Sequence, residues 1–295
     1  MGDFPWQYWS DPAEPERWVY HYTTRDAAVG SILPTGQIRL SLFEWMTDPR
    51  ESKTWLFGGR GEGDYDILEL SNRANQLAKA HTKILCVTRD AEEIPLPPNE
   101  RYQRGFAHSR MWTDYAGGHS GACLIFDRSK LDDAIRTALE PKEVYAGAVS
   151  YSEWTAGLGE AFTIEFDTLQ TLGVDRALLA HIRTYRRLLF HKNLDWASEL
   201  EYRWLAFGDA PTPEFVPFGD ALDGLCVGVN FPPADEETLW YLAERYGIST
   251  IPRLTWFDGR VGVQHLLKPG TSPSGAIHID AVVWGGPRTR ELEID

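Results

Sequence analysis

Two glutamates two positions apart, Glu199 and Glu201, follow a lysine at position 192 and precede Arg203. Side chains two positions apart in a strand point to the same face, so both carboxylates would lie on one face near these cations. A charge network of this kind can hold one carboxylate ionised and ready to accept a hydrogen bond from a sugar hydroxyl. The alternative left open by the pattern is one solvated face of an edge strand.

A second candidate is the histidine in the apolar and aromatic stretch 18–24. The pattern predicts a strand that ends near His21, a helix over 25–33 closed by Gly36, and a second strand at 38–40. A strand end is a common place for chemistry, because the sheet fixes the side chain and the following loop leaves room for a ligand. A hydrogen-bonded core or capping role is the competing interpretation of His21.

A third cluster lies at 112–121, where aromatic residues, several glycines and His119 occur together. The pattern predicts a short helix that passes through a glycine turn into a strand ending at Asp127. The three clusters are far apart in the sequence, and each is expected at an end of a strand. Only the fold can bring them together.

Several other chemistries are not supported by the sequence. There is no Gly-x-Ser-x-Gly elbow and no cysteine beside a base, so covalent acyl transfer has no nucleophile. The glycine-rich run at 58–63 follows no strand and precedes no lysine–hydroxyl pair, so we expect a connector or a lid and no phosphate-binding loop. The eight histidines show no metal-ligand spacing, and no metal site is predicted.

The composition predicts a well-packed protein that repels polyanions at long range. Of its 295 residues, 43% are apolar and 13% aromatic, and the net charge is -14. This charge counts against non-specific nucleic-acid binding but leaves room for a local basic groove. The three cysteines lie in apolar runs typical of reduced core residues, and no leader or membrane-spanning run is visible. We therefore expect a soluble cytoplasmic protein without membrane contact.

The periodicity of apolar residues predicts the elements that must position these clusters. Helices are expected at 67–81, 131–139 and 236–246, with a long helix at 169–190 interrupted near Gly173. Strands are expected at 83–88, 144–151, from 201 onwards, 224–229, 251–257 and 261–266. We expect one domain over 18–268, preceded by a docked arm at 1–17 and followed by an irregular tail at 269–295.

Taken together, the motifs resemble a widespread bacterial family of unknown function, family two-nine-seven-one. The motifs are Tyr20-His-Tyr-Thr, Asp48-Pro with an acid at Glu51, Cys86-x-Thr88, Met111-Trp-x-x-Tyr115-x-x-x-His119-x-Gly121 and Lys192-x-x-x-Trp196-x-x-Glu199-x-Glu201-x-Arg203. The chain departs from the family at Thr47 and Arg50, where the family usually has Asn and Phe, and at Val87, which replaces a common Phe.

The N-terminal segment of that family is similar in turn to ADP-ribosyltransferases that modify DNA and RNA. This similarity implies an α+β fold with a mixed, mostly antiparallel split sheet and flanking helices, and NAD as the substrate. It also implies that His21 donates a hydrogen bond to a ribose of NAD. Tyr22 and Thr23 would then line the nicotinamide side, and Trp112 or Tyr115 would stack on the nicotinamide ring.

The same resemblance implies roles for the charged residues. Either Glu201 or Glu199 would be the carboxylate near the C1 carbon, because an oxocarbenium-like sugar needs a fixed negative charge. The remaining residues that the resemblance assigns to NAD binding are Arg50, Arg110 and Lys192 at the pyrophosphate, together with His119 and Arg203.

The resulting hypothesis is an NAD-dependent ADP-ribosyltransferase-like enzyme that cleaves the nicotinamide–ribose bond. It would modify a nucleic acid or a protein as a toxin or an anti-phage effector, and an antitoxin or another regulatory partner would control it. Two alternatives remain open. One is a nucleotide-binding sensor without turnover, and the other is a metal-dependent nucleic-acid-processing enzyme in which the Glu199 and Glu201 pair binds the metal.

Overall fold

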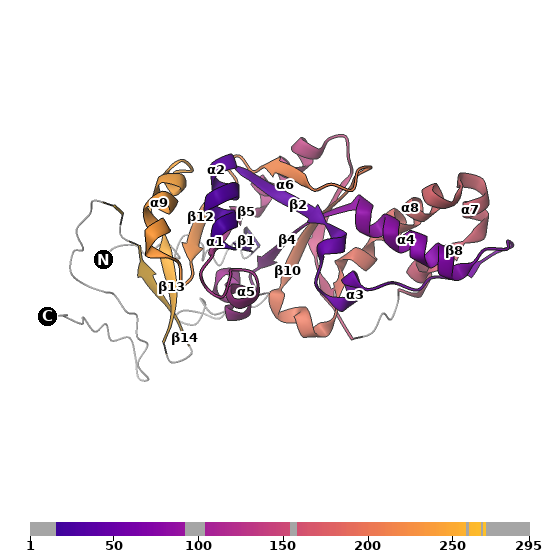
Figure 1. Ribbon diagram of the computed structural model, residues 1–295, viewed down its shortest axis with the longest axis horizontal. Coiled ribbons are helices and arrows are strands. Elements are labelled where there is room, and N and C mark those ends of the chain that lie inside the picture. Colours follow the sequence, from indigo (N-terminus) through magenta and orange to yellow (C-terminus); the bar gives the residue numbers. More distant parts are fainter. Residues whose placement is uncertain (1–15, 92–103, 154–157, 258–259, 267, 270–295) are drawn as a thin grey trace. The chain divides into compact units, whose positions relative to one another are not determined.

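The computed structural model describes residues 16–91, 104–153, 158–257, 260–266 and 268–269 (Figure 1). Apart from their inner ends, the predicted arm at 1–17 and the predicted tail at 269–295 lie outside the described residues. The chain divides into two compact units: one comprises Met1–Ile38, Val87–Ile135 and Pro217–Asp295, the other Arg39–Cys86 and Arg136–Val216. The expectation of a single domain stays a prediction.

A mostly antiparallel sheet forms the first unit. Strand β1 (Trp18–Thr23) pairs antiparallel with β5 (Ala122–Asp127) along its whole length, and His21 lies opposite Leu124. On its other side, β5 pairs antiparallel with β12 (Leu222–Val227). The strand predicted to end near His21 therefore continues for two more residues.

The remaining strands of the first unit extend this sheet. Strand β13 (Pro252–Phe257) pairs parallel with β12 and antiparallel with β14 (Arg260–His265). The end of β4 (Thr82–Arg89) pairs antiparallel with β1 through Thr88 and Arg89. Each of these strands was predicted from its apolar run to within two residues at either end.

The first unit also contains several helices, of which the first directly follows β1. The helix predicted after β1 is present, but it contains a π-helical turn at Ala28–Ile32 and ends where Gly36 adopts a left-handed φ of 67°. The Thr24 side chain accepts a hydrogen bond from the backbone N–H of Ala27 and caps its start. The α-helices of this unit are α1 (Arg25–Ala27), α2 (Leu33–Thr35), α5 (Ser109–Asp114) and α9 (Glu236–Glu244), while α6 (Arg128–Leu139) continues into the second unit.

The second unit also contains a sheet, in which β10 is the strand of most interest. Strand β10 (Glu201–Phe207) pairs with β4 and, antiparallel, with β6 (Val144–Ala148). Strand β2 (Gln37–Leu42) pairs antiparallel with β4 and also pairs with β11 (Glu214–Pro217). Because β10 has two partners, the alternative of an edge strand is wrong.

Two small parallel pairs complete the strands of the second unit. Strand β7 (Ser150–Tyr151) pairs with β9 (His191–Lys192). Strand β3 (Gly58–Arg60) pairs with β8 (Thr163–Glu165). Half of the glycine-rich run predicted to be a connector or lid is therefore a strand, because the segment 163–165 supplies a partner that lies far away in the sequence.

Helices α4, α7 and α8 pack together in the second unit (Figure 1). Helix α4 (Ile67–His81) has the predicted bounds, and Asp66 caps it by accepting hydrogen bonds from two backbone N–H groups. The predicted interruption at Gly173 is present and separates α7 (Phe166–Leu172) from α8 (Val174–Thr184). The shorter helical segments are α3 (Pro49–Ser52) and the 3-10 helices Phe43–Trp45, Gly159–Phe162, Arg186–Phe190 and Leu194–Glu199.

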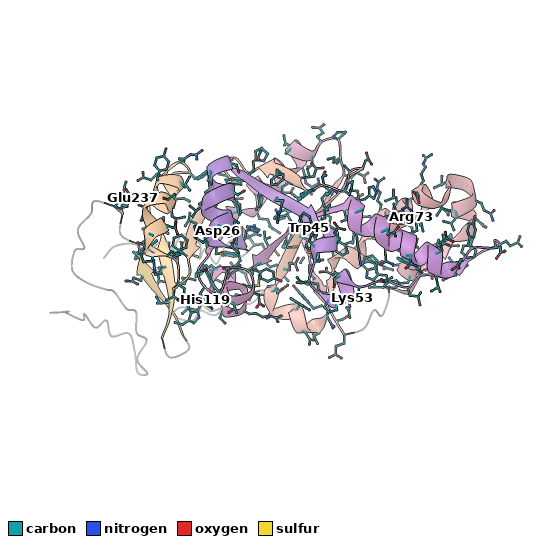
Figure 2. All side chains as sticks on the ribbon, in the orientation of Figure 1. Asp26, Trp45, Lys53, Arg73, His119 and Glu237 are labelled. Atoms are coloured by element: carbon teal, nitrogen blue, oxygen red, sulfur yellow. The ribbon has the colours of Figure 1, made fainter. Side chains whose placement is uncertain are left out.

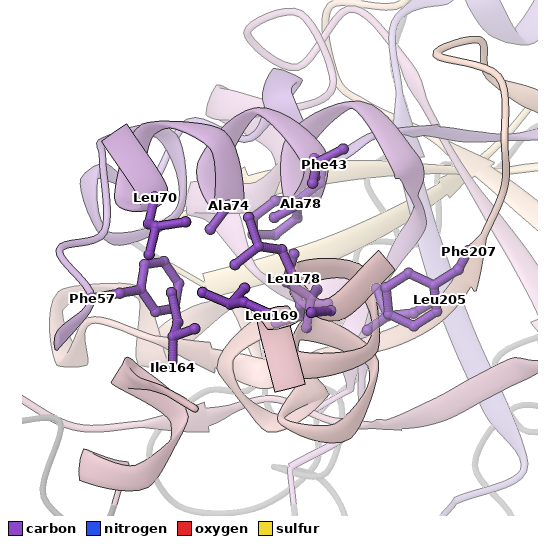
Figure 3. Close-up of a cluster of buried hydrophobic side chains, with 14 of the residues drawn as sticks. Phe43, Phe57, Leu70, Ala74, Ala78, Ile164, Leu169, Leu178, Leu205 and Phe207 are labelled. Carbon is purple, nitrogen blue, oxygen red and sulfur yellow. The ribbon is translucent and has the colours of Figure 1, made fainter. Parts of the chain in front are cut away.

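The core of the second unit lies between these helices and the sheet (Figure 3). Leu70, Ala74 and Ala78 recur along one face of α4, and Figure 3 shows Leu169 and Leu178 of the facing helices among them. Leu178 has no exposed surface. Its replacement by Ala would cost roughly 2 to 5 kcal/mol of stability, because the methyl groups leave a cavity behind.

The first unit has a core of its own, formed by aromatic residues, the two fully buried cysteines Cys123 and Cys226, and small apolar side chains. The predicted α+β class and the mixed, mostly antiparallel sheet with flanking helices are confirmed. Among the residues that the structure describes, no helix combines the length and the apolar character needed to cross a bilayer.

Candidate functional site

Lys192 brings the two predicted glutamates together in the second unit. Its Nζ donates hydrogen bonds to Glu199 Oε2 at 2.6 Å and to Glu201 Oε2 at 3.0 Å. All three side chains are buried, with exposed fractions of 5%, 3% and 5%. The charge network predicted from the sequence is present, and the alternative of a solvated face is wrong.

The two glutamates reach Lys192 by a route that strand periodicity does not describe. Glu199 is the last residue of a 3-10 helix and Glu201 is the first residue of β10, so they do not belong to one strand. Leu200 between them adopts a left-handed backbone with φ 46° and ψ 47°. A residue with a Cβ adopts this conformation at a cost of about 1 to 2 kcal/mol. The surrounding contacts therefore hold a strained turn that places both carboxylates at one ammonium group.

Arg203 holds Glu201 from the other side. Its Nε donates to Glu201 Oε1 at 2.5 Å and its Nη2 to Glu201 Oε2 at 3.0 Å. Its Nη1 donates to the carbonyl of Leu189 at 2.6 Å and also to Glu51 Oε1. Two parallel bonds from one guanidinium fix both the position and the orientation of a carboxylate. Glu201 thus has a single, well-defined orientation.

The short helix α3 closes this network through the motif Asp48-Pro-x-Glu51. Asp48 is buried; one of its oxygens caps α3 at the N–H of Arg50, and the other accepts from the N–H of Asn193 at 3.1 Å. The Arg50 guanidinium donates to the carbonyl of Lys192 at 3.1 Å. Asp48 and Glu51 belong to the family motif, and the same four residues were predicted to form a loop or the start of a helix. A helix-capping Asp-Pro followed by a third-position acid was the available signal for their structural role.

Charges in the network shift the pKa values of its carboxyl groups in opposite directions. Burial by itself would raise the pKa of Glu201, but the positive charges of Arg203 and Lys192 outweigh it and lower this pKa to about 2. For Glu51, burial outweighs the attraction of Arg203 and raises the pKa. Glu51 Oε2 is also buried without a hydrogen-bond partner. Glu201 is therefore held ionised, while Glu51 accepts a proton more readily than an exposed glutamate.

Three further side chains surround the network. The Trp196 ring lies over Lys192, with 4.7 Å between Nζ and the ring centroid, a cation–π arrangement. The Tyr151 hydroxyl accepts a hydrogen bond from the N–H of Glu201 at 2.8 Å. Burial and the charge of Glu201 raise the pKa of the Cys86 thiol, so Cys86 stays protonated beside this carboxylate.

The predicted aromatic residues of the first unit lie in its core. Tyr22 donates its hydroxyl to the carbonyl of Gly105 at 2.6 Å, and its ring meets Trp112 edge to face at 5.1 Å. Trp112 has no exposed surface and donates its indole N–H to the carbonyl of Phe106 at 2.8 Å. The stacking of Trp112 on a nicotinamide ring stays a prediction.

His119 occupies a tightly defined position in the first unit (Figure 2). Its backbone is left-handed with φ 69°, and its ring lies nearly parallel to Trp112 and edge-on to Trp256. Nε2 lies 3.2 Å from the Thr113 hydroxyl, whereas Nδ1 is buried without a hydrogen-bond partner. Burial lowers the pKa of His119 and so favours the neutral ring.

The other predicted residues of the first unit have the following positions. His21 is half-buried within β1, and Thr23 is buried at the end of the same strand. Tyr115 is half-buried against the aromatic core, and Arg110 forms an exposed ion pair with Asp114 one helical turn away. The structure thus groups Lys192, Glu199, Glu201 and Arg203 in the second unit. The roles of His21, Thr23, Tyr115 and Arg110 toward NAD stay predictions.

Within the described ranges, no three His, Cys, Asp or Glu side chains come together in a way that could hold a metal ion. Oε2 of Glu199 and Oε2 of Glu201 both accept hydrogen bonds from Lys192 Nζ. The ammonium group of Lys192 therefore occupies the position between the two carboxylates that a metal ion would need.

Residues 111–204 match the model of a family described as a protein of unknown function, DUF2971. This match confirms the family resemblance over residues 111–204, a span that includes His119, Lys192, Glu199, Glu201 and Arg203. No curated protein and no solved structure matches the chain. The expected similarity to ADP-ribosyltransferases stays a prediction.

Proposed function

We propose that this chain is an NAD-dependent ADP-ribosyltransferase-like enzyme that uses the buried carboxylate of Glu201. The observation that supports the proposal is the fixed, ionised state of this group. Arg203 binds both of its oxygens, Lys192 binds one of them, and the pKa is lowered to about 2. A carboxylate that neither rotates nor takes up a proton is what an oxocarbenium-like sugar requires.

The proposed reaction breaks the bond between nicotinamide nitrogen and the ribose C1 carbon. The bonding electrons leave with nicotinamide, which becomes neutral, and positive charge develops on the sugar. Glu201 stabilises this charge and accepts a hydrogen bond from the ribose 2-hydroxyl. A nucleophile of the acceptor then attacks C1 and releases its proton. Glu199 shares Lys192 with Glu201 and positions this cation.

The proposal requires a movement within the second unit, because the side chain of Glu201 is only 5% exposed in the described conformation. The 3-10 helix Leu194–Glu199 carries Trp196, whose ring lies over Lys192. Displacing this ring would expose the ammonium group and the carboxylates beside it. The aromatic ring is also suited to face a positively charged nicotinamide, because its electron-rich face attracts cations.

The same geometry favours one alternative, a nucleotide-binding sensor without turnover. Both oxygens of Glu201 already accept hydrogen bonds from cations, and the carboxylate is buried. A group in this state can shape a binding site without taking part in a reaction. The alternative differs from the enzyme in one measurable respect, which is that nicotinamide is not released.

The deciding experiment measures nicotinamide release from NAD labelled in its nicotinamide ring, with mixed protein, RNA and DNA as acceptors. We expect release by the wild-type protein and none by Glu201→Gln, which keeps the shape of the side chain and removes its charge. Glu165→Gln is the matched control, because Glu165 pairs with Arg60 at the surface of the same unit. NAD binding without release by the wild-type protein would support the sensor, and undiminished release by Glu201→Gln would exclude Glu201 as the key carboxylate.

A further inference from the structure

Three arginines at the end of α8 and in the 3-10 helix Arg186–Phe190 lie over aromatic rings. The Arg183 guanidinium lies 5.5 Å from the ring centroid of Phe207, and that of Arg186 lies 4.1 Å from the centroid of Tyr145. The two rings meet edge to face at 6.1 Å. Phe207 is buried in the core, whereas Tyr145 is half-buried, so the two guanidinium groups lie over one core ring and one partly exposed ring.

A third arginine in the same stretch of chain also lies over an aromatic ring. The Arg187 guanidinium lies 5.9 Å from the ring centroid of Tyr185. Arg186 donates a hydrogen bond to the carbonyl of Arg183 at 3.1 Å, which fixes the spacing between the first two. We call the set Arg183, Arg186, Arg187, Tyr145 and Tyr185 the arginine–aromatic surface. Arg183 and Arg187 are exposed, and Arg186 is half-buried.

These arginines differ from other arginines of the same unit in their partners. Arg60 and Arg73 form exposed ion pairs with Glu165 and Asp175. Within the described residues, none of the three arginines of the arginine–aromatic surface pairs with a carboxylate. Glu143, which precedes the strand of Tyr145, accepts a hydrogen bond from the Tyr145 hydroxyl. The chain has 43 acidic and 29 basic residues, so three arginines that have no carboxylate partner in the described part of the chain form a distinct local positive charge.

A guanidinium that rests on a ring keeps its N–H groups at the edge, where they bind a phosphate through two parallel hydrogen bonds. The rings beside it provide faces on which unpaired bases stack. A duplex hides its bases from such rings, and an acidic peptide has no bases to stack. We propose that the arginine–aromatic surface binds single-stranded nucleic acid through its phosphates and its bases.

A single strand bound at the arginine–aromatic surface would also be available as an acceptor of ADP-ribose. If ADP-ribose is transferred, the strand held at the arginine–aromatic surface is the substrate class that receives it. That assignment rests on the proposed function, whereas binding of the strand does not. Binding is therefore measured in the absence of NAD, so that its failure and the failure of the transferase are seen separately.

The test is fluorescence anisotropy with labelled single-stranded RNA and DNA of about 20 nucleotides, which exceeds the usual site size of such surfaces. We expect the double variant Arg183→Ala/Arg187→Ala to bind at least tenfold more weakly than the wild-type protein. The matched control Arg60→Ala/Arg73→Ala removes the same charge from exposed positions of the same unit, and its affinity should change less than twofold. Circular dichroism checks that both variants are folded.

The salt dependence gives a second readout. Two lost phosphate contacts should reduce the slope of log affinity against log salt by about 1.4, since each contact on a single strand contributes about 0.7. The proposal is overturned if the wild-type protein does not bind, or if both double variants lose affinity equally. It is also overturned if polyglutamate competes as well as an unlabelled strand, because the surface would then recognise acidic protein.

Discussion

Lys192 and Glu201 form a buried ion pair in which Nζ lies 3.0 Å from Oε2, and each side chain is 5% exposed. The same Nζ binds Glu199 at 2.6 Å. A buried pair of this kind is weak evidence for stability as a whole, because taking both charges out of water is costly. The removal of one partner, however, leaves an uncompensated charge in the interior. This asymmetry makes the network testable by single substitutions.

We expect Lys192→Met to destabilise the protein by about 3 to 5 kcal/mol, because it leaves two carboxylates without their shared cation. Urea denaturation followed by circular dichroism measures the change. Lys142→Met is the control, since Lys142 pairs with Glu214 near the surface and should contribute less than about 1 kcal/mol. Equal losses in the two variants would show that burial of the Lys192 pair has no special role.

Leu200 provides a test of the strained turn between the two glutamates. Because its φ is 46°, Leu200→Gly should be more stable than Leu200→Ala by about 1 kcal/mol. Gln76 lies on the exposed face of α4 and serves as the control. There, Gln76→Ala should be more stable than Gln76→Gly by about 1 kcal/mol, since Gly is unfavourable within a helix. The denaturant midpoints of the four variants measure these differences in stability. If the Ala variant were the more stable one at both positions, the left-handed turn at Leu200 would be contradicted.

The lowered pKa of Glu201 should make the folded protein lose stability in acid. A carboxyl whose pKa is lower in the folded state contributes stability above its unfolded pKa, and this contribution is lost as the pH falls toward the folded value. For a shift from 4.5 to about 2, the contribution is about 3 kcal/mol and is lost between these two pH values. The free energies of unfolding of the wild-type protein and Glu201→Gln should therefore converge as the pH falls over this range. A difference that is constant with pH would show that Glu201 is not held ionised.

His119 should titrate below the ordinary histidine range in the folded protein, because its burial disfavours the charged ring. NMR of ring-labelled histidines measures this pKa, and the protein in urea supplies the unfolded reference. His119→Asn assigns the signal with little backbone strain, since Asn tolerates a left-handed φ. A folded pKa at or above the unfolded one would contradict the packing of the ring between Trp112 and Trp256.

Local patterns in the sequence determined those elements whose stability is local. Helix α4 has its predicted bounds because its apolar residues recur at helical spacing and Asp66 caps it. The break at Gly173 was visible because glycine favours its φ of 78°. The residue types at Lys192 and Glu201 likewise sufficed to predict a charge network.

Other features of the protein depend on contacts between residues that are distant in the sequence. Only the tertiary structure decided these features. The pairing of β10 with β4 and β6 excluded the alternative of an edge strand, and Glu201 is buried in the fold. The strand β3 exists because β8, more than one hundred residues later, supplies its hydrogen bonds. Desolvation and ion pairing depend on which groups surround a charge in space. The sequence therefore determined which residues carry the charge, and the fold decided that Glu201 is buried and fixed in its ionised form.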